Sequence, residues 1–353
     1  MQTNNLPQKT GYRQTVCFIA VTLVLLLSMV MSSCGTTGEK QPSPVTENKA
    51  VETKTDSSAR PIETPAAPPE GFKHRQFEVN GVQIHYVIGG KGDPLLLIHG
   101  FGQNWYMWNR ILPELSKHFT VIAPDLPGVG ESGKPDHGYD KKALAVMVHE
   151  LINKLGYSKI NVAGHDIGMM VAYSYAVQYA KEVNKLAMMD ALIPGIEPVW
   201  SDKRLFAWWF GFFGWPASGE LVAGRENLFF KNFWPTVGHI ERPFTKQEET
   251  EFIRAYSVKG ATTGAFHWFG AFPQDAKDNL EYAKHKLQMP VLAMGGEFAA
   301  TYMPEHCRLV AQNVKGVIIK NSGHWLVQEN TEQTQKELVA FFTGDDSKNR
   351  AGK

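Results

Sequence analysis

The sequence predicts an α/β fold, with a mostly parallel sheet flanked by helices and an inserted helical cap. From Gly71 onward, short apolar runs alternate with longer stretches whose apolar residues recur at helical spacing. This alternation is typical of parallel strands that are connected by helices. Residues 191–287 interrupt the alternation, because they contain aromatic-rich helical sequence and no strand-like run.

Seven apolar runs are expected to form strands. Several of them are continuous, which is typical of strands buried on both faces of a parallel sheet. In chain order they read QIHYVIGG, DPLLLIHG, TVIAPDLPG, KINVAGHD, VNKLAMMD, MPVLAMGGE and KGVIIK. Apolar spacing predicts helices over 139–155, over 167–179 and over 331–342.

The inserted segment is expected to form a helical cap at about 192–287. Its stretches RLFAWWFGFFGWP and ENLFFKNFWP combine helical spacing with many aromatic residues, most of which are expected to be hydrophobic core. The cap follows a strand, where a lid over the strand ends would lie. The folded domain is therefore expected over 71–343, and a flexible tail over 344–353.

The N-terminus predicts a signal peptide of the lipoprotein type over residues 1–33. Lys9 and Arg13 precede the uncharged run TVCFIAVTLVLLLSMVM, which is a little short for a membrane span. The run ends in MSSCGTTG, which resembles the bacterial lipobox, so Cys34 is the expected lipidation site. An uncleaved anchor helix is the alternative, and both interpretations attach the protein to a membrane. We expect an exported, lipid-anchored protein of the bacterial cell envelope.

Residues 34–70 are expected to comprise the lipidated cysteine and a disordered linker. This segment is rich in Pro, Thr, Ser and Glu and nearly free of large apolar residues, so it cannot bury enough surface to fold. Of the three cysteines only Cys307 lies in the folded part, where no intrachain disulfide is therefore expected. The formal net charge of +1 gives no indication of a nucleic-acid partner.

The stretch Gly164-His165-Asp166-Ile167-Gly168 has the pattern of a G-x-S-x-G nucleophile elbow, with aspartate in place of serine. It lies between an expected strand and an expected helix, as that elbow requires. An aspartate, with an ordinary pKa of about 3.9, is already an anion at neutral pH. It can displace a leaving group from a saturated carbon and form an alkyl ester. A histidine can then activate water to hydrolyse the ester, so Asp166 is the candidate nucleophile.

Four separated motifs, HGFGQNWYMW, VIAPDLPGVGESGKP, GHDIG and SGHW, follow one another in the chain. Together they resemble the α/β-hydrolases of the epoxide hydrolase and dehalogenase branch, over roughly Phe72 to Phe342. The likeness is strongest to the Cif-like secreted bacterial epoxide hydrolases, and the end of the cap adds to it. The resemblance implies an α/β-hydrolase fold and an enzyme that opens an apolar epoxide to a diol.

The resemblance also implies roles for other residues. His324, after the last expected strand, would be the general base, and a capping histidine of the last helix is the alternative. Asp190 is favoured as the acid that orients this histidine, with Glu297 as the second candidate. The backbone N–H groups of Phe101 and Ile167 would form the oxyanion hole.

Several residues of the cap are candidates for the group that assists the leaving group. Where related caps carry tyrosine or histidine, this chain has His267-Trp268-Phe269 and Trp208-Trp209. Tryptophan donates hydrogen bonds but has no readily transferable proton, which suits a halide better than an alkoxide. The candidates that contact the leaving group are Trp209, Tyr256, His267 and Trp268, with His239 and Tyr282 as further cap donors.

Epoxide hydrolysis is the expected activity, and hydrolysis of an apolar alkyl halide is the alternative. Related haloacid enzymes carry arginines after the nucleophile, and here Ile167, Met169 and Met170 stand in this region, which favours a small apolar substrate. A non-catalytic binder that uses the cap cavity is a further alternative. No metal cluster, phosphate loop or dinucleotide fingerprint is present, so no cofactor or metal is expected. The oligomeric state is left open.

Overall fold

The computed structural model describes residues 64–345. The expected signal peptide, Cys34, most of the expected linker and most of the expected tail lie outside the described residues. Within residues 64–345, no helix is both long enough and apolar enough to span a membrane.

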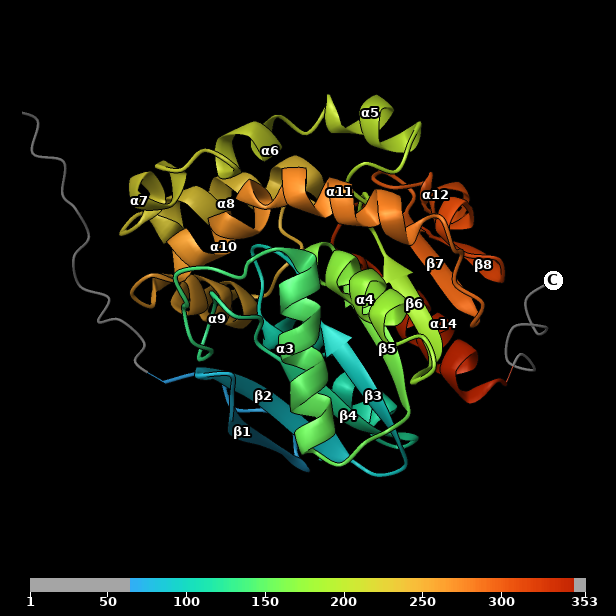
Figure 1. The fold of residues 1–353 in the computed structure, drawn as a ribbon. Coiled ribbons are helices and arrows are strands. Elements are labelled where there is room, and N and C mark those ends of the chain that lie inside the picture. Colours follow the sequence, from blue (N-terminus) through green and yellow to red (C-terminus); the bar gives the residue numbers. More distant parts are fainter. Residues whose placement is uncertain (1–63, 346–353) are drawn as a thin grey trace, which may run out of the picture. The chain divides into compact units, whose positions relative to one another are not determined.

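An eight-stranded sheet with the order β1-β2-β4-β3-β5-β6-β7-β8 forms the centre of the described part (Figure 1). β1 pairs antiparallel with β2, and β2 pairs antiparallel with β4, whereas the other neighbours are parallel. The strands are β1 (Phe72–Val79), β2 (Val82–Gly90), β3 (Asp93–Ile98), β4 (Phe119–Pro124), β5 (Ile160–His165), β6 (Val183–Met189), β7 (Val291–Gly296) and β8 (Val314–Ile319). The predicted fold class is confirmed, and each of the seven expected strands is present.

β1 is the strand that the apolar runs do not reveal. Its sequence FKHRQFEV is mostly polar and is only partly buried, because the strand lies at the edge of the sheet and pairs with β2 alone. By contrast, β5 in the middle of the sheet is buried over its whole length. Continuous apolar sequence therefore marks the central strands, and the edge strand lacks it.

Helices flank the sheet, and α3 and α4 lie in front of the strands in Figure 1. α4 contacts β5 and β6, whereas α12 contacts β7 and β8. The helices outside the insertion are η1 (Trp105–Trp108), α2 (Leu112–Leu115), α3 (Lys141–Lys154), α4 (Ile167–Gln178), α12 (Met303–Val310), α13 (Leu326–Glu329) and α14 (Thr331–Thr343).

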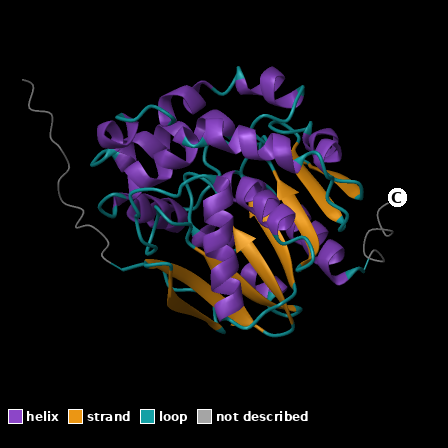
Figure 2. Cartoon of the chain, viewed as in Figure 1, coloured by secondary structure: helices purple, strands orange, loops and turns teal. Residues whose placement is uncertain are grey.

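The insertion between β6 and β7 consists of helices and the loops that join them, and the arrows of the parallel strands in Figure 2 point toward it. In this part of the described chain the helices are α5 (Val199–Arg204), α6 (Trp208–Phe213), α7 (Ser218–Val222), α8 (Glu226–Val237), α9 (Lys246–Ser257), α10 (Ala261–Gly270) and α11 (Phe272–Tyr282). The cap therefore lies over the carboxyl ends of the parallel strands, which is where α/β folds place their sites.

Buried ion pairs hold the cap on the sheet domain. The Lys141 ammonium at the start of α3 lies 2.8 Å from an Asp275 carboxylate oxygen of α11, and it also donates to the backbone carbonyl of Trp268. The Lys141 backbone N–H donates to the other Asp275 oxygen at 2.8 Å. A second pair joins Arg110 to Glu248 of α9. A buried charge is costly unless it is paired, so these contacts fix how α9 and α11 sit over the sheet.

Candidate active site

Asp166 occupies a sharp turn between β5 and α4. Its φ of +53° is strained for a residue with a side chain, and this strain is typical of functional turns. Gly164 and Gly168 make the turn possible: a Cβ on Gly164 would lie 2.1 Å from the Gly168 carbonyl oxygen, and one on Gly168 would lie 2.2 Å from the Ile98 carbonyl oxygen. The local sequence thus brings the carboxylate out at the carboxyl end of β5.

Two backbone N–H groups bind the Asp166 carboxylate. The Phe101 N–H donates to Oδ2 at 2.8 Å, and the Ile167 N–H donates to the same carboxylate. The phenyl ring of Phe101 packs against Phe213 and Phe269 of the cap, with centroids 4.7 and 5.0 Å away, which fixes the loop that presents its N–H. These are the two donors that were expected from the sequence to form the oxyanion hole.

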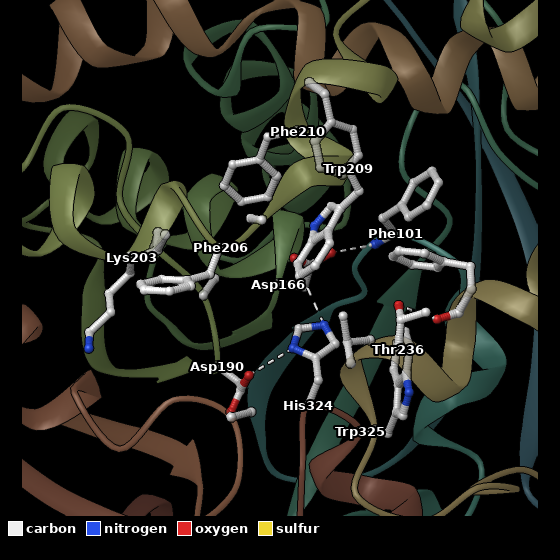
Figure 3. A pocket seen from close by; sticks show the side chains of 18 of the residues that line it. Phe101, Asp166, Asp190, Lys203, Phe206, Trp209, Phe210, Thr236, His324 and Trp325 are labelled. Carbon is white, nitrogen blue, oxygen red and sulfur yellow. Dashed lines mark hydrogen bonds and ion pairs between the residues drawn. The ribbon is translucent and has the colours of Figure 1, made fainter. Parts of the chain in front are cut away.

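His324 lies between two carboxylates. Its Nδ1 is 2.7 Å from Asp190 Oδ1, and its Nε2 is 4.0 Å from Asp166 Oδ1 (Figure 3). The Gly296 N–H donates to the second Asp190 oxygen at 2.7 Å, so the orienting carboxylate is itself held on both sides. The imidazole therefore presents Nε2 to the nucleophile.

Glu297, the second candidate for the orienting acid, does not face His324. One of its oxygens lies 2.9 Å from the Lys320 ammonium, and the other accepts the Asn321 N–H at 3.0 Å. Its carboxylate is directed to the surface beyond β7, so the geometry favours Asp190 and excludes Glu297 from the contact with the imidazole.

Burial and the neighbouring carboxylates act in opposite directions on this site. Burial alone lowers the pKa of His324, but the hydrogen bond and the charge of Asp190, followed by the charge of Asp166, raise it above its usual value. For Asp166 burial is the largest effect and raises the pKa, against the opposing effects of His324 and the two N–H donors. The two groups thus stabilise each other's charged forms before any reaction.

A family model described as the alpha/beta hydrolase fold matches residues 93–331. A soluble epoxide hydrolase from Corynebacterium sp. (strain C12) is 34% identical over 279 residues, which cover 76% of this chain and 96% of that protein. The chain belongs to the α/β hydrolases. Within them it falls in the epoxide hydrolase and dehalogenase branch, as the sequence motifs predict.

Two further relatives of this α/β hydrolase represent the two activities of that branch. The crystal structure of the Cif epoxide hydrolase from Acinetobacter nosocomialis is similar with a TM-score of 0.72 and 27% identity, covering 81% of this chain and 99% of that one. A fluoroacetate dehalogenase from Burkholderia sp. is 40% identical over 128 residues, which are 35% of this chain and 42% of that protein. The similarity to epoxide hydrolases thus covers far more of the chain.

A cavity of about 410 Å³ opens above the three residues of the hydrolase site. Aromatic side chains form much of its wall, and Phe206 is 79% exposed, which marks a mouth between α5 and α6. The aromatic residues that line it include Phe101, Phe206, Trp209, Phe210, Phe233 and Phe269.

Of the four expected leaving-group candidates, Trp209 alone lines this cavity, and Figure 3 shows its side chain extending toward Asp166. Trp268 is fully buried and donates its indole N–H to the Pro127 carbonyl at 3.1 Å. His267 is exposed and contacts the ring of Tyr139. The expectation that Trp268 and His267 contact the leaving group is therefore wrong in geometry, because helix α10 directs both side chains away from the cavity.

Tyr256, the cap donor that the sequence favoured, also lies outside the cavity. Its hydroxyl accepts the Gly102 N–H at 2.7 Å and is completely buried behind the loop that follows Phe101. It supports the oxyanion loop from behind. His239 is exposed and stacks on Phe298, 3.8 Å between ring centroids, and Tyr282 does not line the cavity either.

Three polar residues line the cavity without having been singled out by the sequence: Lys203, Thr236 and Tyr302. Tyr302 follows β7 and immediately precedes α12, and Lys203 lies in α5. No motif marks them. The available signal was position, since polar residues shortly after the carboxyl end of a central strand tend to reach the site of an α/β sheet.

Proposed function

We propose that this hydrolase opens an apolar epoxide to a diol through a covalent alkyl ester of Asp166. The proposal rests on the observation that the two Asp166 oxygens have different contacts. Oδ2 is bound by the Phe101 N–H, and Oδ1 faces His324 Nε2 across 4.0 Å. The aromatic cavity above them supports an apolar substrate.

In the first step Asp166 Oδ1 attacks a ring carbon of the epoxide. A C–O bond of the ring breaks, and its electron pair goes to the ring oxygen. Oδ2 stays against the Phe101 N–H and becomes the carbonyl oxygen of the new ester. No base is needed, because the nucleophile is already an anion.

In the second step His324 removes a proton from a water molecule, and the hydroxide attacks the Asp166 carboxyl carbon. The negative charge that develops on Oδ2 is bound by the N–H groups of Phe101 and Ile167. When the intermediate collapses, the diol oxygen leaves with the proton held by His324. Asp190 fixes the imidazole through Nδ1 and stabilises its positive charge.

Formation of the ester leaves more of His324 in the neutral form at the moment when a base is needed. The charge of Asp166 is one of the causes that raise the pKa of His324. Alkylation removes this charge, so the pKa of His324 falls and more of the imidazole is neutral in the intermediate. The electrostatic attraction between Asp166 and His324 is thus present before the reaction and is lost when the ester forms.

Isotope labelling tests the ester mechanism. Many turnovers of 1,2-epoxyhexane in ¹⁸O-water are expected to place ¹⁸O in the side chain of Asp166, because the attacking water oxygen joins its carboxyl carbon. Mass spectrometry of the peptide that contains Asp166 gives the measurement, and the peptide that contains Asp190 is the control. An unlabelled Asp166 after turnover would show that water attacks the epoxide directly.

Hydrolysis of an apolar alkyl halide is the second candidate. Trp209 favours it, because its indole N–H lines the cavity, has no hydrogen-bond partner among residues 64–345, and suits a halide. The partial similarity to a fluoroacetate dehalogenase also supports it. Both reactions begin with attack by Asp166 and differ in the leaving group.

We also propose that the protein is exported and anchored to the bacterial cell envelope by a lipid on Cys34. The basic residues Lys9 and Arg13, the apolar run after them and the lipobox-like MSSCGTTG support this proposal. Cys34→Ala is expected to move the protein from the membrane fraction to the soluble fraction and to abolish its labelling by palmitate. Unlabelled wild-type protein in the soluble fraction would contradict the anchor.

A further inference from the structure

The ring oxygen of an epoxide leaves as an alkoxide, which needs a proton, and the cap does not provide an acid for it. Tyr256, His267 and Trp268 lie outside the cavity, and the indole of Trp209 does not give up its proton. A proton donor must therefore be sought among the other residues that line the cavity.

Most other protic groups on the cavity wall are already occupied. The Thr236 hydroxyl donates to the Phe233 carbonyl at 2.6 Å, and the Trp325 indole N–H donates to the Trp234 carbonyl at 3.0 Å. His324 binds Asp190 through Nδ1 and is needed as the base in the second step. Lys203 lies at the exposed mouth, and its side chain points away from Asp166 in Figure 3.

Tyr302 remains, and its hydroxyl has no hydrogen-bond partner among the described residues. The residue lies between β7 and α12, outside the inserted cap. Burial is the main cause that raises the pKa of Tyr302 far above its usual value, and the charges of Asp190 and Asp166 add to it. The hydroxyl is therefore protonated at any physiological pH, and it lies within electrostatic range of the nucleophile.

We propose that Tyr302 donates the proton to the departing epoxide oxygen, in place of the missing cap acid. The inference rests on the proposed epoxide hydrolysis and adds to it a catalytic residue from the sheet domain. It also explains how an epoxide can be served by a cap in which, among the described residues, the indole of Trp209 is the donor left without a partner near Asp166. The hydrogen bond from Trp209 and the proton from Tyr302 would act on one oxygen.

The protons balance over the cycle. As the bond from Asp166 Oδ1 to carbon forms and the ring C–O bond breaks, the ring oxygen takes the phenolic proton and leaves a phenolate. Hydrolysis of the ester returns Asp166 as a carboxylic acid, because the attacking water contributes its O–H. The loss of this proton to the phenolate, through solvent in the cavity, restores both residues. The Lys203 ammonium, 5.9 Å from the Tyr302 ring centroid, is placed to stabilise the phenolate in the meantime.

The test compares two epoxides that differ in how much they need an acid. Ester formation by His324→Gln and by the double variant His324→Gln/Tyr302→Phe is followed by intact-protein mass spectrometry with 1,2-epoxypropane and with 1,1,1-trifluoro-2,3-epoxypropane. The fluorinated alkoxide is the weaker base and leaves more easily without a proton. Loss of a general acid typically costs 10²–10⁴-fold. We expect Tyr302→Phe to slow ester formation from 1,2-epoxypropane by about 100-fold, at the low end of that range. The factor by which it slows ester formation from the fluorinated epoxide should be at least about ten times smaller.

A structural role for Tyr302 predicts a different result, because a distorted site slows both epoxides equally. Equal losses, or a change smaller than about threefold for 1,2-epoxypropane, would overturn the assignment. Tyr282→Phe, in a cap tyrosine outside the cavity, is the matched control and is expected to change neither rate. If His324→Gln itself forms no adduct with either epoxide, the proposed function fails and the assignment with it.

Discussion

His324→Gln is expected to react once with an epoxide and then to stop. Attack by Asp166 needs no base, whereas hydrolysis of the ester needs a neutral imidazole at Nε2. Turnover should therefore fall by about 10²–10⁴-fold, the usual contribution of a general base, while the ester accumulates. Intact-protein mass spectrometry is expected to show an added mass equal to the whole epoxide, and peptide mapping should place it on Asp166.

The size of the adduct separates the two candidate functions. An alkyl halide that reacts would add the mass of the substrate minus hydrogen halide.

His267→Gln is the matched control, because this exposed histidine lies outside the cavity and its loss should leave turnover unchanged. Asp166→Ala/His324→Gln should form no adduct. A wild-type enzyme that opens epoxides while His324→Gln forms no ester would rule out the covalent mechanism, and inactivity of both on a broad panel would favour the ligand-binding alternative.

The nucleophile was predictable because its signal is local. The turn at Asp166 needs glycine at 164 and 168 for steric reasons, and the strand and helix beside it are largely apolar and buried. The identity of the orienting acid is not local. Asp190 and Glu297 each follow a parallel strand, and β6 and β7 are neighbours in the sheet. The sequence therefore places both residues at the same edge of the sheet, where either carboxylate could reach His324. The turn after each strand decides which one faces the imidazole.

The cavity wall was the least predictable part. Trp209 and Trp268 are the same residue type in the same kind of aromatic helix, yet only the first lines the cavity. The difference arises from how α6 and α10 pack on one another and on the sheet, which depends on contacts distant in sequence. Tyr302 belongs to no motif, and its importance appears only when the other protic groups on the wall prove to be occupied.

Asp190→Asn is expected to lower turnover severely, and Glu297→Gln is expected to be nearly silent. In serine–histidine–aspartate triads the equivalent change lowers kcat by about 10⁴, because the histidine is left in the wrong tautomer. The hydrogen bond from His324 Nδ1 to Asp190 Oδ1, at 2.7 Å, places the same requirement on this site. We expect turnover to fall by about 10³–10⁴-fold, while ester formation by Asp166 is largely kept.

The pH dependence of ester hydrolysis should shift in a direction that general damage to the site would not produce. His324 must be neutral to act, so the rate falls as the pH drops through its pKa. The hydrogen bond and the charge of Asp190 raise this pKa above its usual value, and Asp190→Asn removes the charge. The residual hydrolysis in Asp190→Asn should therefore persist to lower pH than in the wild type. In Glu297→Gln, whose carboxylate contacts Lys320 and Asn321 at the surface, both the rate and the profile should be unchanged. A large loss in Glu297→Gln, or an acid limb that moves to higher pH in Asp190→Asn, would show that another group orients the histidine.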